Sequence, residues 1–281
     1  MKILVTGGAG FIGTNLIKLL KNTQNCEIFS IDNYSIGLKD NHIDEVEYID
    51  DDILNIGNYN LDFDIIFHLA ALSRIQPSFD DPTSVYEINT TGTQRVLEYA
   101  KKINSRVIYS GSSSMHHNPS ISPYAMTKYL GEELCKLYKY TFDLNIDIVR
   151  FYNVYGPYEI LEGDWAAVIG KWRDQLKKGL PLTIVGDGRQ RRDFTHVDDI
   201  VDGLIKISKK KSDNYIWELG SGKNYSIYEV FEMFKKKFDC ECIFIDEQKG
   251  NYRETLRENN YALTELNWNP RGSLEDYISN L

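Results

Sequence analysis

A glycine-rich segment near the amino terminus constrains the fold of this chain more than any other feature. The segment Gly7–Gly13 (GGAGFIG) follows directly on a short β-like run, Lys2–Thr6. Glycines at this spacing permit a tight turn, a close approach of backbone N–H groups to a pyrophosphate, and close packing of the next helix on the strand. An apolar stripe of helical period follows, from Ile12 to Leu20. The pattern predicts a strand–turn–helix unit that binds a dinucleotide.

The rest of the chain continues this alternation of short apolar runs and longer helical stretches. Runs that are apolar on both faces and separated by helices indicate a parallel sheet covered on both sides. Right-handed crossovers then give an α/β fold with a doubly wound parallel (Rossmann) sheet. The predicted strands are Glu27–Asp32, Val46–Ile49, Asp64–Leu69, Arg106–Ser110, Ile146–Arg150 and Tyr215–Leu219, and the predicted helices include Val85–Lys102 and Tyr124–Tyr140.

The pattern loosens after about residue 150, where prolines and glycines punctuate shorter elements. One clear helix, Ile227–Phe238, and a short strand, Cys242–Ile245, stand in the last part of the chain. We therefore expect a smaller α/β substrate-binding lobe. Residues 1–154 and a returning segment at about 192–222 are assigned to the nucleotide-binding domain, and residues 155–191 and 223–281 to the smaller lobe.

Charge and composition narrow the class of partner. With 32 basic and 41 acidic side chains the formal charge is −9, which argues against a nucleic-acid or anionic membrane surface. No run of roughly 18 apolar residues occurs, and the four cysteines lack the spacing of a metal site. The chain is expected to lie in the cytoplasm, without a bound metal.

Asp32 completes the dinucleotide signature. It ends the predicted second strand, 19 residues after Gly13, and can accept hydrogen bonds from both ribose hydroxyls. An acidic residue at this place repels a 2′-phosphate, and no arginine or lysine follows until Lys39. The cofactor is therefore expected to be NAD rather than NADP.

A second constellation carries the chemistry. Tyr124 and Lys128 begin a predicted amphipathic helix, and their i, i+4 spacing puts the phenol and the ammonium on one face. A free tyrosine titrates near ~10, but a neighbouring ammonium, joined by a positive nicotinamide ring, favours the phenolate and lowers that pKa. Ser112, just past a predicted strand end, can hydrogen-bond the same substrate oxygen and steady developing charge. The three residues are the predicted catalytic group.

Together these motifs resemble the extended short-chain dehydrogenase/reductase family, of the NAD-dependent epimerase/dehydratase type, over nearly the whole chain. The resemblance rests also on Asp52-Ile53, His68–Ala71, Asn89 with Gly92-Thr93, Arg150–Pro157 and Arg192–Asp199. It implies that NAD is bound by Gly7, Gly10, Phe11, Ile12, Gly13, Asp32, Asn33, Ser35, Gly37, Asp52, Ile53, Leu69, Ala70, Ala71, Asn89, Ser110, Tyr124, Lys128 and Tyr152.

Within this family the positions that begin at the catalytic serine help to separate reactions. Sugar-nucleotide 4,6-dehydratases carry an acid pair there, whereas this chain has Ser112-Ser113-Ser114 and resembles the nucleotide-sugar (UDP-glucose type) 4-epimerases. The implied mechanism is transient oxidation at C4, with Tyr124 taking the hydroxyl proton and NAD the hydride, followed by hydride return to the opposite face. Another NAD-dependent nucleotide-sugar enzyme (a dehydratase, decarboxylase or reductase) and a non-catalytic NAD-binding protein remain the alternatives.

The same resemblance implies a site for a nucleotide-diphosphate sugar. Arg192 matches the arginine that binds the diphosphate, and UDP is the family default for the nucleotide. Where the family usually shows Arg-x-Gly-Asp, this chain has Gln248–Asn251, so Lys249 or Arg253 is expected to replace the missing cation. The full set of implied substrate contacts is Ser78, Ser112, Ser113, Ser114, Asn153, Arg192, Lys249 and Arg253.

Two further expectations concern a loop and the oligomeric state. Only 12 positions separate Ser112 from Tyr124, fewer than the family usually has, so the roof of the sugar pocket must differ. His116 and His117 in this short loop could contact substrate or stay exposed. The resemblance also implies a homodimer through Val85–Lys102 and Tyr124–Tyr140, which carry tyrosines beyond one apolar stripe, namely Tyr86, Tyr99, Tyr129 and Tyr138.

Overall fold

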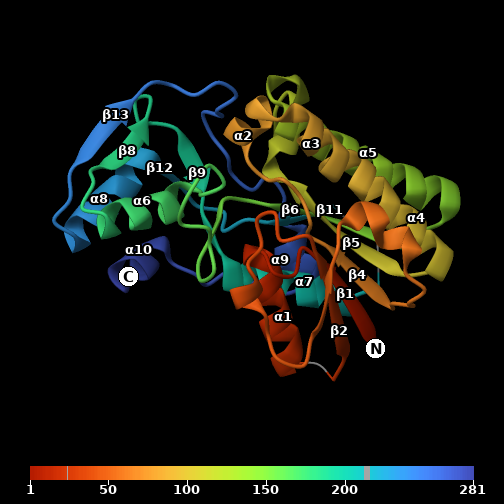
Figure 1. Cartoon of the computed structure of the whole chain (residues 1–281). Coiled ribbons are helices and arrows are strands. Elements are labelled where there is room, and N and C mark those ends of the chain that lie inside the picture. Colours follow the sequence, from red (N-terminus) through yellow and green to blue (C-terminus); the bar gives the residue numbers. More distant parts are fainter. Residues whose placement is uncertain (24, 212–215) are drawn as a thin grey trace.

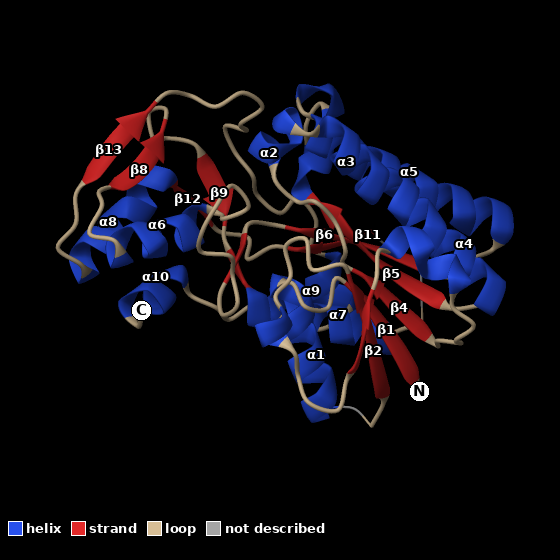
Figure 2. Cartoon of the chain, viewed as in Figure 1, coloured by secondary structure: helices blue, strands red, loops and turns tan. Residues whose placement is uncertain are grey.

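The computed structural model describes residues 1–23, 25–211 and 216–281, and a twisted parallel sheet forms its centre (Figures 1 and 2). The described residues give this sheet seven strands in the order β11-β6-β5-β4-β1-β2-β3, with parallel pairing between all neighbours. The order reverses between β1 and β4, where ligands of doubly wound sheets bind. The predicted Rossmann sheet is confirmed. Its strands are β1 (Lys2–Thr6), β2 (Glu27–Asp32), β3 (Glu47–Asp50), β4 (Ile65–His68), β5 (Arg106–Ser112), β6 (Ile146–Phe151) and β11 (Ile216–Leu219).

Helices cover both faces of the sheet, which explains why its strands are apolar on both sides (Figure 2). On one face α1 (Phe11–Thr23) and α7 (Val197–Lys209) pack in a core that contains Leu16, Leu204 and Trp217. On the other face α4 (Thr93–Ile103) and α5 (Pro123–Phe142) pack in a second core around Leu97 and Tyr109. This layering leaves the carboxyl ends of the strands open for a site.

The predicted helix 85–102 is helical throughout but contains a π-helical stretch. The chain forms α3 (Pro82–Tyr86), a π-helical turn (Glu87–Gly92) and then α4. Gly92 lies against Ile53, because a Cβ atom at Gly92 would stand 2.6 Å from the Cδ1 atom of Ile53. The predicted helix at Tyr124 is confirmed and longer, since Ser122 accepts a hydrogen bond from Ala125 N and caps its start.

A smaller α/β lobe stands beside the sheet, as predicted, and has a core of its own (Figure 1). In it β13 (Cys242–Ile245) pairs in parallel with β8 (Leu182–Val185), and β12 (Asn224–Ser226) pairs antiparallel with β9 (Arg191–Asp193). The helices of the lobe are α6 (Val168–Lys177), α8 (Ile227–Lys237) and α10 (Leu274–Ser279), and its core includes Trp172, Phe231 and Phe234. A short pair of strands, β7 (Val154–Tyr155) and β10 (Thr195–His196), lies where the chain passes between the two parts.

One carboxy-terminal segment departs from the predicted division. The helix α9 (Tyr261–Glu265) and the residues after it were assigned to the smaller lobe, but Ala262 and Trp268 belong to the core of the sheet domain. Trp268 Nε1 donates to the carbonyl of Asp199 at 2.8 Å, which fixes this segment on α7. Tyr215, the predicted first residue of the last strand, lies outside the described residues. No helix within the described ranges is long and apolar enough to cross a membrane.

Candidate active site

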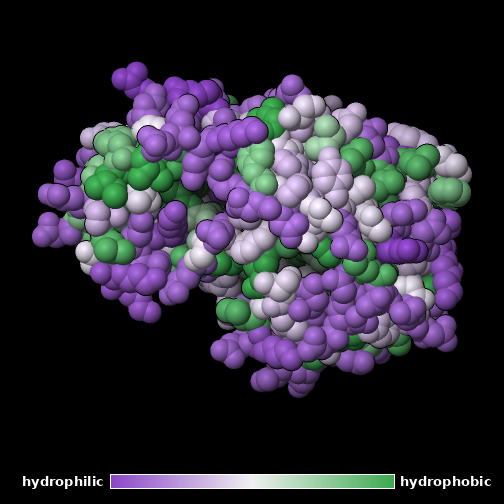
Figure 3. Space-filling model, turned by 45° about the horizontal axis from the view of Figure 1, so that its top comes forward, coloured by the Kyte–Doolittle hydropathy of each residue, from purple (hydrophilic) through white to green (hydrophobic). Residues whose placement is uncertain are grey.

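A cavity of about 580 Å³ opens at the carboxyl ends of the strands and extends to the smaller lobe. Hydrophobic residues lie in and around the hollow between the two parts of the molecule, while much of the surrounding face is hydrophilic (Figure 3). Of the predicted site residues, the cavity is lined by Gly7, Gly10, Phe11, Ile12, Gly13, Asp32, Asn33, Ser35, Gly37, Asp52, Ile53, Leu69, Ala70, Ala71, Ser110, Ser112, Ser113, Tyr124, Lys128, Tyr152, Asn153 and Arg192. The predicted residues that do not line it are Ser78, Asn89, Ser114, Lys249 and Arg253.

The glycine turn is packed so tightly that side chains would not fit. Gly7 has φ +71°, and a Cβ atom there would stand 2.9 Å from the backbone of Ala70. A Cβ atom at Gly13 would stand 2.2 Å from the carbonyl oxygen of Gly7. The helix α1 therefore starts close against the sheet, with its positive end at the cavity. This shape fits a dinucleotide pyrophosphate.

Asp32 is held rigidly at the end of β2. Its Oδ2 accepts from the backbone N–H of Ala9 at 2.9 Å, and its Oδ1 accepts from that of Tyr34 at 2.9 Å. Burial raises the pKa of Asp32, and these two backbone hydrogen bonds offset part of that rise. Beside it, Asn33 Nδ2 donates to Asp52 Oδ2 at 2.7 Å. The arrangement presents a carboxylate where the ribose of a dinucleotide is expected.

The predicted catalytic residues come together on β5 and α5. Tyr124 Oη donates to Ser112 Oγ at 3.2 Å, and Lys128 Nζ donates to the carbonyl of Ser110 at 2.9 Å. Burial raises the pKa of Tyr124, while the hydrogen bond to Ser112 and the charge of Arg74 lower it in part. The predicted lowering of this pKa by Lys128 together with a positive nicotinamide ring stays a prediction. Burial lowers the pKa of Lys128 itself to about 8.

Two residues that were predicted to contact substrate or cofactor, Ser78 and Asn89, lie behind the residues that line the cavity. Ser78 is fully buried, donates to the carbonyl of Ile75 at 2.6 Å and accepts from the backbone N–H of Tyr124 at 3.2 Å. Asn89 is also buried and exchanges hydrogen bonds with the backbone N–H and carbonyl of Leu72 at 2.8 and 2.9 Å. The structure thus gives both side chains a supporting place, because their polar atoms are already bonded within the protein.

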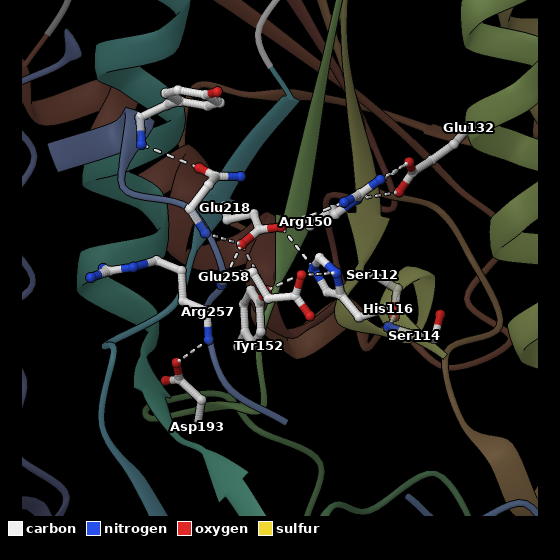
Figure 4. A network of polar contacts seen from close by, with 12 residues as sticks. Ser112, Ser114, His116, Glu132, Arg150, Tyr152, Asp193, Glu218, Arg257 and Glu258 are labelled. Atoms are coloured by element: carbon white, nitrogen blue, oxygen red, sulfur yellow. Dashed lines mark hydrogen bonds and ion pairs between the residues drawn. The ribbon is translucent and has the colours of Figure 1, made fainter. Parts of the chain in front are cut away.

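A polar network joins the turn after the serines to the sheet and to the carboxy-terminal segment (Figure 4). His116 Nε2 lies 2.7 Å from Glu218 Oε1 on β11, and His116 Nδ1 lies 2.9 Å from Glu258 Oε2. Glu218 also accepts from Tyr152 Oη at 2.9 Å. Arg150 connects Glu218, at 3.4 Å, with the buried carboxylate of Glu132 on α5, at 2.9 Å.

The contacts of His116 and His117 bear on whether these loop histidines contact substrate or stay exposed. His116 is not an exposed loop residue, because its side chain is only 16% exposed and both ring nitrogens face carboxylates. His117 stacks on Tyr252 with ring centroids 4.0 Å apart. Neither histidine lines the main cavity, although Tyr252 does. In the described part of the chain, no group of three or more His, Cys, Asp or Glu side chains is arranged to hold a metal ion.

The nucleotide end of the site differs from expectation. Arg192 lines the cavity, donates to Asn251 Oδ1 at 2.5 Å and has no ion pair with the described residues; burial lowers its pKa to about 10. Arg253, in contrast, is exposed and pairs with Asp187 at 3.2 Å. Lys249 is exposed as well, with its Nζ 5.0 Å from the centre of the Phe79 ring. Lys249 and Arg253, which were expected to replace the missing diphosphate-binding cation, therefore contact Phe79 and Asp187 instead.

Several residues line the cavity that the sequence did not single out. Among them are Arg74, Gln248, Asn251, Tyr252 and Thr255. Thr255 Oγ1 accepts from Asn153 Nδ2 at 3.0 Å and so supports a predicted substrate residue. The only available signal was proximity in sequence, since Arg74 closely follows the Ala70-Ala71 motif and Asn251 closes the segment that replaces Arg-x-Gly-Asp.

Comparison with known proteins agrees with this geometry. Residues 3–220 match the NAD-dependent epimerase/dehydratase family. The chain belongs to that family. A UDP-glucose 4-epimerase of Mycolicibacterium smegmatis is 30% identical over 99% of this chain and 96% of its own length. A UDP-glucuronate 4-epimerase of Thermodesulfobacterium geofontis is 32% identical, covering 97% of this chain and 92% of its own.

Solved structures show the same relationship. The UDP-glucuronic acid 4-epimerase of Bacillus cereus, in complex with UDP-glucuronic acid and NAD, superimposes with a TM-score of 0.89, 31% identity, and coverage of 99% of this chain and 96% of that one. Relatives of this NAD-dependent epimerase/dehydratase also include decarboxylases and dehydratases. The cofactor is NAD, and the tight glycine turn and the fixed Asp32 carboxylate fit it.

Proposed function

We propose that this NAD-dependent enzyme is a nucleotide-sugar 4-epimerase. The observation that supports the proposal most is the serine cluster at the end of β5, where Ser112 accepts a hydrogen bond from Tyr124 and the next two positions are Ser113 and Ser114. Elimination of water from a sugar needs an acid and a base beside the oxidised carbon. The acid pair that the family's 4,6-dehydratases carry here is replaced by two hydroxyls, which favours a reaction without elimination.

The chain's own residues would serve the oxidation in three ways. NAD, when bound, supplies the acceptor and donor of a hydride. Tyr124 Oη takes the proton of the C4 hydroxyl and later returns it, and Ser112 Oγ holds the same oxygen through a hydrogen bond. Lys128, anchored on the carbonyl of Ser110, brings positive charge to the buried phenol when the cofactor site is occupied. Ser112 and Lys128 are buried and Tyr124 is partly buried, which limits the access of water to the reacting atoms.

Arg192 is the proposed diphosphate ligand. It is the cavity-lining arginine on β9, and its guanidinium is not neutralised by a carboxylate among the described residues. Asn153, held by Thr255, is proposed to contact the diphosphate or the sugar. Guanidinium groups bind phosphate oxygens through paired N–H donors, which suits this task. We propose UDP as the nucleotide, in line with the UDP-sugar enzymes to which the chain is similar.

The proposal is tested by an NMR screen of UDP-, dTDP-, GDP- and ADP-linked sugars with the purified enzyme. We expect interconversion of C4 epimers at constant total sugar, without net consumption of added NAD. The Tyr124→Phe variant should lose at least ~10²-fold in turnover because its ring lacks the proton-transferring oxygen. Formation of a pentose by loss of CO₂, a 6-deoxy-4-keto sugar, or unchanged turnover in Tyr124→Phe would overturn the assignment.

We also propose that the enzyme is a homodimer through the outer face of α4 and α5. Two of the tyrosines named for this interface, Tyr99 and Tyr138, are buried within the chain's own core and are therefore unavailable. Large apolar side chains are still exposed here, namely Tyr129, Leu137, Tyr140 and Phe142 on α5, and Tyr86 at the end of α3 within the predicted interface segment 85–102. A particle of about twice the 32.5 kDa chain mass in light scattering is expected, and a monomer at micromolar concentration would refute it.

A further inference from the structure

Arg74 brings a second arginine to the cavity, apart from Arg192. It stands directly before α2 (Ile75–Asp80), in the loop that follows β4, and it lines the cavity together with Ser73 and Ile75. Its Nε donates to the carbonyl of Trp165 at 2.8 Å, and its Nη1 donates to that of Ser73 at 3.1 Å. Both acceptors are neutral carbonyls, and within the described residues no carboxylate lies within ion-pair distance of this guanidinium.

This arrangement leaves a partly buried positive charge with no carboxylate of the described residues within ion-pair distance. Taking a guanidinium out of water is costly unless an anion accompanies it, and burial lowers the pKa of Arg74 accordingly. The charges of Tyr124 and Glu159 also act on Arg74. Glu159 Oε1 is bound to Arg173 Nη1 at 2.9 Å and to Tyr277 Oη at 3.3 Å, and Glu159 Oε2 has no hydrogen bond to Arg74. A guanidinium has five N–H donors, so several remain for a ligand. An anionic ligand group would supply the missing partner.

The position of Arg74 indicates which part of the ligand that group belongs to. Arg74 directly precedes α2, and Ser78 of α2 accepts a hydrogen bond from the backbone N–H of Tyr124 at 3.2 Å. The charge of Arg74 also lowers the pKa of Tyr124, so the guanidinium lies toward the end of the cavity where the sugar is proposed to react. Arg192, in contrast, is held on β9 by Asn251 and is the proposed diphosphate ligand. The carbonyl of Trp165 further ties Arg74 to the segment of the smaller lobe that precedes α6 and lines the same cavity.

We infer that Arg74 binds a carboxylate carried by the sugar, so that the substrate is a nucleotide-linked uronic acid rather than a neutral nucleotide hexose. The inference rests on the proposed function, because it names the substrate class of the same site. A carboxylate matches the paired N–H geometry of a guanidinium, and the partly buried position strengthens the pair relative to one in open water. A phosphate oxygen of the nucleotide offers similar chemistry, so the test must separate the two sources of anion.

The test is calorimetric binding of UDP, UDP-glucose and UDP-glucuronate, and of their dTDP counterparts, to the wild-type chain and to Arg74→Gln. With the better-bound nucleotide, the wild type should prefer the uronate over the neutral sugar by about tenfold or more. Arg74→Gln should weaken the uronate about 10- to 100-fold and the free nucleotide less than about twofold. Arg271→Gln serves as the matched control, since Arg271 is exposed and lies outside both the cavity lining and the helices of the proposed dimer interface.

The outcomes separate the alternatives. An equal loss for all three ligands would assign Arg74 to the diphosphate, and no loss would make it only a clamp on the carbonyl of Trp165; either result overturns the inference. If Arg74→Gln does not fold, judged by its circular dichroism and melting, the wild-type preference still decides, and equal affinity for the two sugars refutes the proposal. Preferential uronate binding without interconversion would overturn the proposed epimerase function but keep this inference. Epimerisation of UDP-glucose with no preference for the uronate would support the epimerase function and overturn this inference.

Discussion

Acidification is expected to weaken the fold measurably through one carboxylate, Glu218. This side chain is 1% exposed, so its charge depends entirely on the groups around it. Burial alone would raise its pKa, but hydrogen bonds from His116 and from the backbone amides of Asn259 and Glu258 outweigh burial and hold the pKa at about 2. The amide contacts are 3.0 Å and 2.8 Å long. These hydrogen bonds favour the charged form of Glu218, and they are lost when the chain unfolds.

The size and sign of the effect follow from linkage. With an ordinary value of 4.5, a folded pKa of about 2 corresponds to about 3 kcal/mol of stability. Because the folded pKa is depressed, this stability is fully present above pH 4.5 and is lost as the pH falls toward 2. Between pH 6 and pH 3 the loss is about 2 kcal/mol, and the rest disappears below pH 3.

The assay is urea unfolding of the wild type and of Glu218→Gln from pH 6 to pH 3. The difference in free energy of unfolding between the two proteins should shrink by about 2 kcal/mol over this range, since only the wild type can gain a proton at this position. Glu47→Gln, at an exposed position on β3, removes the same charge outside the network and serves as the control. A wild-type minus Glu218→Gln difference that stays constant with pH would refute the reasoning.

Three further predictions concern the site and the core. Ser112→Ala should lower kcat by about 10²-fold with little change in KM, because its hydroxyl is proposed to act on the reacting oxygen; an unchanged kcat in steady-state kinetics would exclude that role. Asp32→Ala should raise the Kd for NAD by about tenfold or more and narrow the preference over NADP, measured by fluorescence titration; unchanged discrimination would contradict the assignment. Asp147→Asn should cost about 3–5 kcal/mol in chemical unfolding, because Arg106, now 2.6 Å from the carboxylate, would keep a covered charge without its partner; a loss below about 1 kcal/mol would show the pair to be unimportant.

Most of the fold could be predicted because its signals are local. Buried parallel strands are continuous apolar runs, and the glycine turn has a spacing that few other structures require. The element boundaries were less certain, as β5 shows. Ser112 was expected just past the strand, yet pairing with β6 continues through Gly111 and Arg150 to Ser112 and Phe151. Backbone pairing across the sheet decides where a strand ends, and the sequence of one strand does not show how far that pairing extends.

Site residues could be predicted only where they belong to a recognisable local motif. The cofactor turn and the pair of Tyr124 and Ser112 were found because their spacing reflects one strand and one helix. The partners of long charged side chains depend on distant parts of the chain. Arg253 meets Asp187, 66 positions away, and His116 meets Glu218, 102 positions away. A local sequence therefore could not show that Arg253 turns outward or that His116 is bound between two carboxylates.

The short loop after the serines gains its order from this network rather than from its own length. His116 ends the 3-10 turn 113–116, directly after Ser112, so fixing the histidine also fixes the direction of the serine turn. Its partner Glu218 pairs in register with Arg150 on β6, and Arg150 reaches Glu132, two helical turns along α5 from Tyr124. Tyr124 and Ser112, the proposed catalytic pair, are thereby linked twice, once by their direct hydrogen bond and once through the carboxyl ends of β6 and β11. Pairing with Phe151 of β6 holds the backbone of Ser112, while the network fixes the short turn that follows it. His116→Ala should therefore lower kcat by loosening the serine turn, while the Kd for NAD stays close to that of the wild type. A variant with normal kcat would show that the serine turn is rigid without this link.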